Sequence, residues 1–439
     1  MIRRVAAFME EHGLVPAGGT VLAGVSGGPD SMALLDVLSR LRLTLGFDLA
    51  CATVDHGLRR GTDEEAALVE REASARSVPW ALLRGDARSE ARRGGGLEEA
   101  ARRVRFDLID AHARGVGAAR IALGHTLDDQ AETVIMRLMR GTGLHGLGGM
   151  SPIRDGKYVR PLLVVPRRDV LGYLEGRAIP WIEDPTNRDG RFVRNRVRMH
   201  VMPALEACQP GAASRISELS DRAREARRAV DAVVQKISER IVEKRGRALV
   251  VDRKALLLVD PALRSFVLRE VLVSLKGDAR RLSRRHIEAV LSICASGRGS
   301  AFVDLPEGIR AERAYDELVI LRRGGEPEEA ASRVDGPGMY RRGDLELAVT
   351  ATGTSDAFPL ELRGRRPGDR LAGRSRRLKR LLIDRKVPRM LRDAFPLLAD
   401  GRDVVWAGGL YLARGAGIEV DMRPVGPSDY LQWLGKQEV

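Results

Sequence analysis

Short apolar runs alternate with amphipathic helical patterns through residues 1–210, and this alternation constrains the fold more than any other feature of the sequence. Buried strands are predicted at 21–25, 49–54 and 121–123, and helices at 31–43, 63–77 and 97–113. Strands separated by helices pair in parallel, and helices then cover both faces of the sheet. The sequence therefore predicts an α/β domain with a doubly wound parallel sheet, in which ligands bind at the carboxyl ends of the strands.

A chain of 439 residues exceeds one ordinary core, so we expect further domains after Pro203 and Pro210. Residues 211–330 are predicted to form a mainly helical domain, with helices at 216–245, 261–275 and 283–295 and strand-like runs at 301–305 and 318–321. Pro and Glu residues at 324–338 are typical of a linker. Residues 338–439, with apolar runs at 345–350 and 404–407, are predicted to form a small α+β domain.

The chain is basic, with a formal net charge of +14. Such a charge favours an anionic partner, although a genome rich in arginine codons would raise the same number. The location of the charge decides between these readings, because residues 363–392 contain thirteen Arg or Lys and only Asp369 and Asp384. This patch has no aromatic residue, so we expect it to contact phosphates rather than stack on bases.

Cys51, Cys208 and Cys294 are widely separated and form no CxxC pair. This spacing argues against a zinc knuckle, an iron–sulfur site or a disulfide framework, and it suits a reducing compartment. No uncharged apolar stretch approaches the ~18 residues of a membrane helix, and Glu10 and Glu11 interrupt the N-terminal apolar run too early for a signal peptide. We therefore expect a cytoplasmic protein that makes no membrane contact.

A glycine-rich turn follows the first predicted strand and opens the first long helix. The turn consists of Ser26, Gly27, Gly28, Pro29, Asp30 and Ser31. Backbone N–H groups of such a turn, with the helix N-terminus, form a cradle for anions, and glycines permit the close approach of a ligand. The alternative is a plain strand–turn–helix capped by Asp30 or Ser31. No GK[ST] follows, so the turn is not a Walker loop; the complete pattern SGGxDS resembles the PP-loop ATP pyrophosphatases.

A second constellation, HTLDDQAET at residues 125–133, follows the predicted strand at 121–123. If a helix begins near Leu127, then Asp128, Asp129 and Glu132 project together near the strand end. Carboxylates grouped in this way destabilise a protein unless a cation, an amine or a metal joins them. The preference of helix starts for acids would explain Asp128 and Asp129, but it would not explain His125 or Glu132.

These two motifs together resemble the tRNA(Ile)-lysidine synthetase family, whose PP-loop domain has an adenine-nucleotide α-hydrolase-like fold. Other segments carry the same resemblance: RLMRGTGLHGL at 137–147, VDHGLR at 54–59, WIEDPTN at 181–187, RNR at 194–196, the basic run 379–388 and FPLL at 395–398. The chain departs from the family at Gly96, Phe106 and Thr186, where Asn, Tyr and Ser are usual. The middle of the chain carries no motif of the family.

The resemblance implies a two-step reaction. ATP adenylates the C2 oxygen of the wobble cytidine in an isoleucine tRNA with a CAU anticodon and releases pyrophosphate. The ε-amine of L-lysine then displaces AMP and gives lysidine. An unperturbed lysine amine has a pKa of ~10.4, so exposing its free base at neutral pH costs roughly 4–5 kcal/mol. A carboxylate that binds the ammonium and accepts its proton offsets part of that cost.

Roles follow for the residues that match the family. The turn at 26–31, His56 and His125 are expected to bind ATP, and Asp30 and Asp128 to hold Mg²⁺. Asp129 and Glu132 are expected to bind lysine and, with Asp30, to act in catalysis. Residues 211–330 are expected to position the tRNA. The expected tRNA contacts are Arg102, Arg105, Arg194, Arg196, Arg198, Arg376, Arg377, Lys379, Arg380 and Lys386.

Two other functions stay open at this point. A PP-loop tRNA thiolase would generally need a pair of sulfur-carrying cysteines, which the sequence lacks. A non-catalytic tRNA-binding protein would not need both SGGxDS and HxxDDxxET intact. A homodimer also stays open as the assembly.

Overall fold

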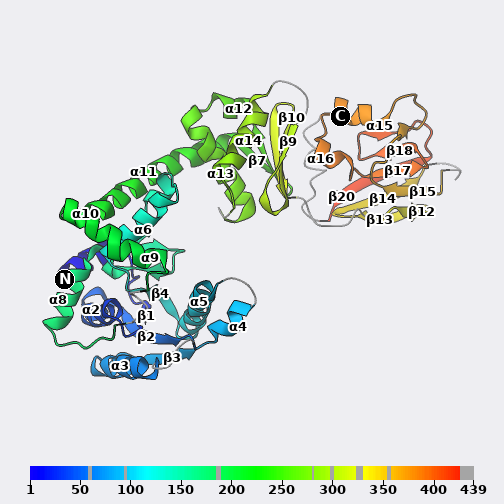
Figure 1. Cartoon of the computed structure of the whole chain (residues 1–439). Helices are drawn as coiled ribbons and strands as arrows, with labels where there is room; N and C mark the ends of the chain where they lie inside the picture. The colour runs from blue at the N-terminus through cyan, green and yellow to red at the C-terminus, as the bar shows by residue number, and fades with distance from the viewer. Residues whose placement is uncertain are drawn as a thin grey trace. The chain divides into compact units, whose positions relative to one another are not determined.

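The computed structural model describes residues 1–57, 62–92, 96–183, 189–278, 281–296, 301–322, 330–352 and 357–425. The chain divides into two compact units, Met1–Ala229 and Val230–Val439 (Figure 1). Thr186 and residues 324–329 of the predicted linker at 324–338 lie outside the described residues. None of the helices in the described ranges is long and apolar enough to cross a membrane.

The first unit contains a six-stranded sheet in the order β3-β2-β1-β4-β6-β5. Its strands are β1 (Thr20–Gly24), β2 (Asp48–Asp55), β3 (Trp80–Arg84), β4 (Ala118–Ala122), β5 (Ile153–Arg154) and β6 (Tyr158–Val159). All neighbours pair in parallel except β5 and β6, which are antiparallel. The predicted doubly wound sheet is therefore confirmed. The strand β3 was missed, and Trp80 at its start is half-buried, with its indole nitrogen donating to Thr53 Oγ1 at 3.0 Å.

Helices cover both faces of this sheet (Figure 1). The helices of this unit before residue 212 are α1 (Ile2–Glu11), α2 (Pro29–Leu45), α3 (Thr62–Ala75), α4 (Ala87–Arg92), α5 (Leu97–Gly115), α6 (Leu127–Met139), α7 (Leu144–Leu147), α8 (Arg167–Glu175), α9 (Val193–Arg196) and α10 (Met202–Cys208). Successive strand residues point to opposite faces. Val21 and Ala23 accordingly join the core built with α2, whereas Leu22 joins the core built with Ile109 of α5.

The long helix α11 (Ala212–Ile241) leads into the second unit, where five antiparallel strands follow the order β7-β8-β11-β10-β9. These strands are β7 (Val242–Arg245), β8 (Ala248–Asp252), β9 (Ala301–Asp304), β10 (Ile309–Ala314) and β11 (Glu317–Arg322), with helices α12 (Arg253–Leu258), α13 (Pro261–Lys276) and α14 (Arg284–Ala295). The sequence indicated only two of these strands. It also extended the long helix through residue 245, which is wrong: Val242–Arg245 pairs with β8 across a turn at Gly246, whose φ is +58°. Strand pairing outweighs the helical pattern there.

Two small sheets complete the second unit, in the orders β12-β15-β17-β18-β16, with β19 beside β18, and β13-β14-β20. The strands are β12 (Ser332–Val334), β13 (Gly338–Arg342), β14 (Leu345–Ala351), β15 (Leu360–Arg363), β16 (Arg370–Leu371), β17 (Leu397–Asp400), β18 (Asp403–Ala407), β19 (Tyr411–Leu412) and β20 (Ile418–Pro424), with helices α15 (Leu378–Asp384) and α16 (Arg389–Arg392). Part of the predicted linker is thus the strand β12. Val250 and Val319 of the five-stranded sheet share one core with Leu382 and Leu397, so the parts of this unit stabilise each other.

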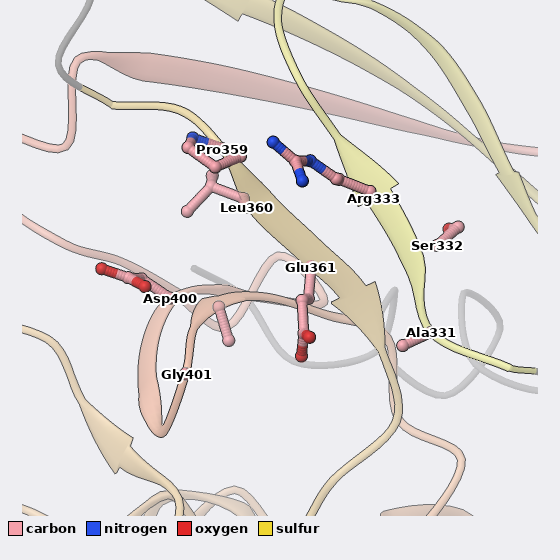
Figure 2. Close-up of a pocket in the computed structure, with 9 residues that line it drawn as sticks. Ala331, Ser332, Arg333, Pro359, Leu360, Glu361, Asp400 and Gly401 are labelled. Atoms are coloured by element: carbon pink, nitrogen blue, oxygen red, sulfur yellow. The ribbon is translucent and has the colours of Figure 1, made fainter.

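A cavity of about 270 Å³ lies among β12, β15 and β17 (Figure 2). Its lining residues are Ala331, Ser332, Arg333, Pro359, Leu360, Glu361, Ala399, Asp400 and Gly401. None of the residues predicted to be functional lines it, so the site must be built from the strand ends of the first unit.

Candidate active site

The glycine-rich turn joins the end of β1 to the start of α2. Ser31 Oγ accepts a hydrogen bond from Ser26 N at 3.1 Å and donates to Gly28 O at 2.8 Å, which closes the turn on itself. Gly27 has a φ of +82°, which an L side chain rarely adopts. The N-cap residue of α2 is Gly28, and no side chain caps this helix. The turn therefore does not use Asp30 or Ser31 as a cap, and the N–H groups at the helix start suit an anion.

Asp30 lies at the first turn of α2 with one carboxylate oxygen, Oδ1, buried and without a hydrogen-bond partner. The other oxygen is 3.6 Å from Arg167 Nη1. Burial raises the pKa of Asp30 to about 6, with Asp129 and Asp128 adding to the rise and Arg167 and Arg198 opposing it. An unpartnered buried carboxylate oxygen is costly, and it is the kind of atom that a cation would satisfy.

Asp129 and Glu132 lie one turn apart on α6, and both are buried, with 7% and 2% of their surface exposed. Asp129 Oδ2 accepts a hydrogen bond from Thr126 N at 2.9 Å and so belongs to a capping box at the start of this helix. This local bond explains why the sequence places Asp129 three residues after Thr126. It leaves Oδ1 of Asp129 and both oxygens of Glu132 for other partners.

Two arginines far along the chain supply those partners. Arg194 donates to Glu132 Oε2 and Asp129 Oδ1, both at 2.9 Å. Arg198 donates to Glu132 Oε1 at 2.6 Å and Oε2 at 3.0 Å, and to Asp129 Oδ1 at 2.8 Å. Burial raises the pKa of Asp129, but Arg194, His125, the Thr126 N–H and Arg198 together outweigh this effect, so that pKa lies below its usual range. The four side chains form a charge-balanced cluster, which we call the acid–arginine cluster.

The contacts of Arg194 and Arg198 in the acid–arginine cluster were not predicted from the sequence. Arg194 and Arg198 were grouped with the tRNA contacts, yet they lie one turn apart on α9 and the following π-turn (Val197–Val201) and point at the acids. Arg196, between them, is exposed. The one-turn spacing of Arg194 and Arg198 lets their two guanidinium groups meet one acid pair.

His125 and His56 follow β4 and β2 at the same edge of the sheet. His125 Nδ1 is buried without a hydrogen-bond partner, and burial lowers the pKa of this imidazole to about 4, so it is neutral at physiological pH. His56 Nε2 lies 3.2 Å from Arg105 Nη2. A residue expected to bind ATP is therefore in contact with one expected to bind tRNA.

The Asp128 carboxylate, on α6, contacts the backbone at the start of α8. Its Oδ2 accepts a hydrogen bond from Arg167 N at 2.6 Å, at the first residue of α8. Arg167 thus joins Asp128 and Asp30, a connection that the sequence analysis missed because Arg167 belongs to no motif. Across the described ranges, no group of three His, Cys, Asp or Glu side chains could hold a metal by itself. A Mg²⁺ at Asp30 and Asp128 would need phosphate oxygens and water as its further ligands.

Known protein families match the chain over both its N-terminal and its C-terminal parts. The profile of the PP-loop domain family matches residues 1–205, and that of the TilS substrate C-terminal domain matches residues 360–423. A tRNA(Ile)-lysidine synthase of Geobacter sulfurreducens is 36% identical over 96% of this chain and 95% of that protein. The chain belongs to the tRNA(Ile)-lysidine synthase family. Relatives with the same name from Symbiobacterium thermophilum and Geobacillus kaustophilus are 34% and 32% identical, over 93% of this chain in both cases and 93% and 95% of their own lengths.

The departures from the usual family residues have visible structural effects. Gly96 is the N-cap of α5 and supplies no side-chain cap, a bond that an Asn at this position could make. The Phe106 ring packs edge-on against Tyr158, with ring centres 5.1 Å apart. The Tyr158 hydroxyl donates to Asp110 Oδ1 at 2.5 Å. Neither departure removes a residue of the acid–arginine cluster.

Ion pairs offset part of the positive charge of the basic patch at residues 363–392. Arg363 and Asp369 form a buried ion pair at 3.0 Å, and Arg365 pairs with Asp393. Arg376 and Arg380 both pair with Asp384. Six exposed basic residues of the patch form no ion pair with another described residue, namely Arg370, Arg374, Arg377, Lys379, Lys386 and Arg389. On α15, Leu378, Leu381 and Leu382 are buried, so this short helix presents its basic side chains to solvent.

Proposed function

We propose that the protein ligates L-lysine to C2 of the wobble cytidine of an isoleucine tRNA with a CAU anticodon, at the expense of ATP. In the first step the C2 oxygen of cytidine attacks the α-phosphorus, and pyrophosphate leaves. In the second step the ε-nitrogen of lysine attacks C2 and loses its proton, the C2–O bond breaks, and AMP leaves with that oxygen. The observation that carries the proposal is the acid–arginine cluster beside a pyrophosphate-type turn.

The turn at residues 26–31 would hold the phosphates of ATP. Its support is the uncapped start of α2 and the positive φ of Gly27. Asp30 and Asp128 would hold a Mg²⁺ that shields the charge of the triphosphate. The unpartnered Oδ1 of Asp30 fits that role, because a bound cation would satisfy it. His125, which is neutral, would donate or accept a hydrogen bond beside the nucleotide without adding charge.

The acid–arginine cluster would bind the lysine substrate. Lysine carries two ammonium groups and one carboxylate, and the cluster offers carboxylates from Asp129 and Glu132 and guanidinium groups from Arg194 and Arg198. Entry of an ammonium group requires at least one guanidinium to turn from the acids, and the α-carboxylate of lysine offers it a new bidentate partner. The exposed fractions of the Arg194 and Arg198 side chains, 38% and 26%, leave room for that movement.

The low pKa of Asp129 bears on the proton that the ε-amine must lose. A carboxylate whose pKa is held below its usual range binds an ammonium well but accepts its proton poorly. Asp129 would therefore bind the ammonium group rather than accept its proton.

Transfer RNA would contact Arg102, Arg105 and Arg196 in the first unit and the exposed basic residues around α15 in the second. We retain three functional regions, residues 1–210 for catalysis, 211–330 for positioning and 338–439 for tRNA binding, in a cytoplasmic enzyme. The thiolase alternative is disfavoured, because burial raises the pKa of the Cys51 and Cys294 thiols to about 12 and about 11 and Cys208 stands alone.

Mass spectrometry of nucleosides tests the proposal directly. Unmodified isoleucine tRNA is incubated with the protein, ATP, Mg²⁺ and lysine labelled with ¹⁵N at the ε position, then digested. We expect lysidine that contains the label. Thiolated cytidine would establish the thiolase function instead, and unmodified cytidine with tight tRNA binding would identify a non-catalytic tRNA-binding protein.

A further inference from the structure

Arg160 is a buried arginine that no motif includes and that the reaction described above does not use. Arg160 directly follows β6. Because Leu123 N donates to Val159 O at 2.9 Å, the backbone at Arg160 is adjacent to the segment that leads from β4 to His125. Side chains alternate along a strand, so Arg160 points to the same face as Tyr158, which packs against α5. Only 5% of Arg160 is exposed.

The guanidinium of Arg160 is poorly satisfied for so buried a cation. Nη1 donates to Ser151 O at 2.5 Å, whereas Nε is buried and has no hydrogen-bond partner. No carboxylate of the described residues lies within ion-pair distance of it. Burial, with the nearby Arg154 and Arg102, lowers the pKa of Arg160 to about 10, yet the group stays charged at neutral pH. A buried and unpaired cation is unfavourable unless an anion joins it.

Arg102 is a second cation without an acidic partner in the described part of the chain, and it lies nearby on α5. Its Cζ is 5.0 Å from the centre of the Phe106 ring, and Arg154 Cζ is 4.8 Å from the same ring. Arg154 differs from Arg102, because its Nε lies 3.2 Å from Asp155. Arg102 is exposed, whereas Arg160 lies in the protein interior.

We propose that Arg160 and Arg102 form a subsite for one phosphodiester of the RNA backbone, adjacent to the nucleotide whose base enters the site beside His125. The inference rests on the proposed function, because it takes RNA as the substrate. A base that leaves its stack brings its own phosphate with it, and a partly buried site must neutralise that charge. Guanidinium groups suit this task, since they donate two parallel hydrogen bonds to phosphate oxygens.

The surroundings favour RNA over ATP as the source of the phosphate. At the ATP turn, Arg167 Nη1 lies 3.6 Å from Asp30 Oδ2, whereas Arg102 packs on Phe106 of α5 and Arg160 follows β6. The ATP turn therefore has a cation of its own. Arg105, one turn after Arg102 on α5, continues the basic surface toward solvent, as a polymer would require.

The test removes the two cations and one RNA charge independently. Arg160→Met and Arg102→Met each remove a positive charge and keep much of the side-chain volume. Arg160→Lys keeps the charge but lacks the guanidinium that donates two parallel hydrogen bonds. Arg114→Met, which removes a basic side chain from the far end of α5, is the control. Each protein is titrated with an anticodon stem-loop RNA, native or with a methylphosphonate in place of the phosphate on either side of the wobble cytidine. ATP KM is measured with the same proteins.

We expect Arg160→Met and Arg102→Met each to weaken binding of native RNA about tenfold, with Arg160→Lys intermediate and Arg114→Met near wild type. One methylphosphonate should weaken binding to wild-type protein equally and add little to either Met variant. A raised ATP KM with unchanged RNA affinity would assign the subsite to ATP and overturn the inference, as would equal methylphosphonate effects in wild type and variants. If Arg160→Met does not fold, the exposed Arg102→Met carries the same comparison. Wild-type protein that binds no tRNA would instead refute the proposed function.

Discussion

Replacing Glu132 with glutamine separates the two roles that the acid–arginine cluster could have. Glu132 accepts three hydrogen bonds, one from Arg194 and two from Arg198. Charged hydrogen bonds contribute about 1.5–3 kcal/mol each, but a glutamine keeps one acceptor. Arg194 and Arg198 are partly exposed, so water screens the charge that loses its partner. We expect Glu132→Gln to lower the free energy of unfolding by about 1–3 kcal/mol.

The effect on lysine should be larger than the effect on ATP. Loss of one charged hydrogen bond to an ammonium raises the lysine KM roughly tenfold to a hundredfold, with ATP KM nearly unchanged. The assay is lysidine formation at varied lysine and fixed tRNA and ATP. Glu72→Gln is the matched control, because Glu72 pairs with Arg76 at 2.7 Å on α3 in the same unit and should affect stability without affecting lysine KM.

A second variant distinguishes a structural from a substrate-binding role. Combining Glu132→Gln with Arg194→Gln restores the charge balance, so part of the lost stability should return while the lysine KM stays high. Asp129→Asn is a poorer probe, because Asp129 Oδ2 also caps α6. An unchanged lysine KM in both Glu132→Gln and Asp129→Asn would show that the acids only hold Arg194 and Arg198, and would refute the reasoning.

Three further predictions concern other residues. Asp30→Asn should abolish pyrophosphate release yet stabilise the metal-free protein at pH 8 by roughly 1–3 kcal/mol. The reason is that the pKa of Asp30 is raised to about 6 in the folded state, which therefore loses stability as the pH rises from about 4 to 6. Thermal unfolding at pH 4 and pH 8 checks the sign, and an equal Tm difference between variant and wild type at both pH values would contradict it. Neutralising Arg377, Lys379 and Lys386 together should flatten the slope of log K for tRNA binding against log salt concentration by about 2. Titrations at several salt concentrations measure this slope. Deleting the whole C-terminal domain is an unsuitable test, because Val250 and Val319 would lose the apolar residues that cover them. Cys208→Ala should retain full activity, and a thiol reagent should label only Cys208 in the native protein, because Cys51 and Cys294 are buried; loss of activity in this variant would revive the thiolase alternative.

Local patterns carried much of the information in this sequence. The alternation of apolar runs and amphipathic segments determined the doubly wound sheet, because side-chain period and chain connectivity together leave few arrangements. The turn at 26–31 and the acids of α6 could also be located, since each depends on neighbours within a few residues, such as the capping bond between Thr126 and Asp129.

What only the tertiary structure decided depends on contacts between distant residues. The partners of Glu132 lie 62 and 66 positions away, at Arg194 and Arg198, and the sequence assigned both arginines to tRNA. Residues 242–245 carry a helical pattern but form the strand β7, because pairing with β8 satisfies their backbone groups. The patch at 363–392 loses part of its charge to Asp393, which lies outside that window. Periodicity reports which way a side chain points on its own element, whereas the free energy of a charge depends on what the fold brings against it.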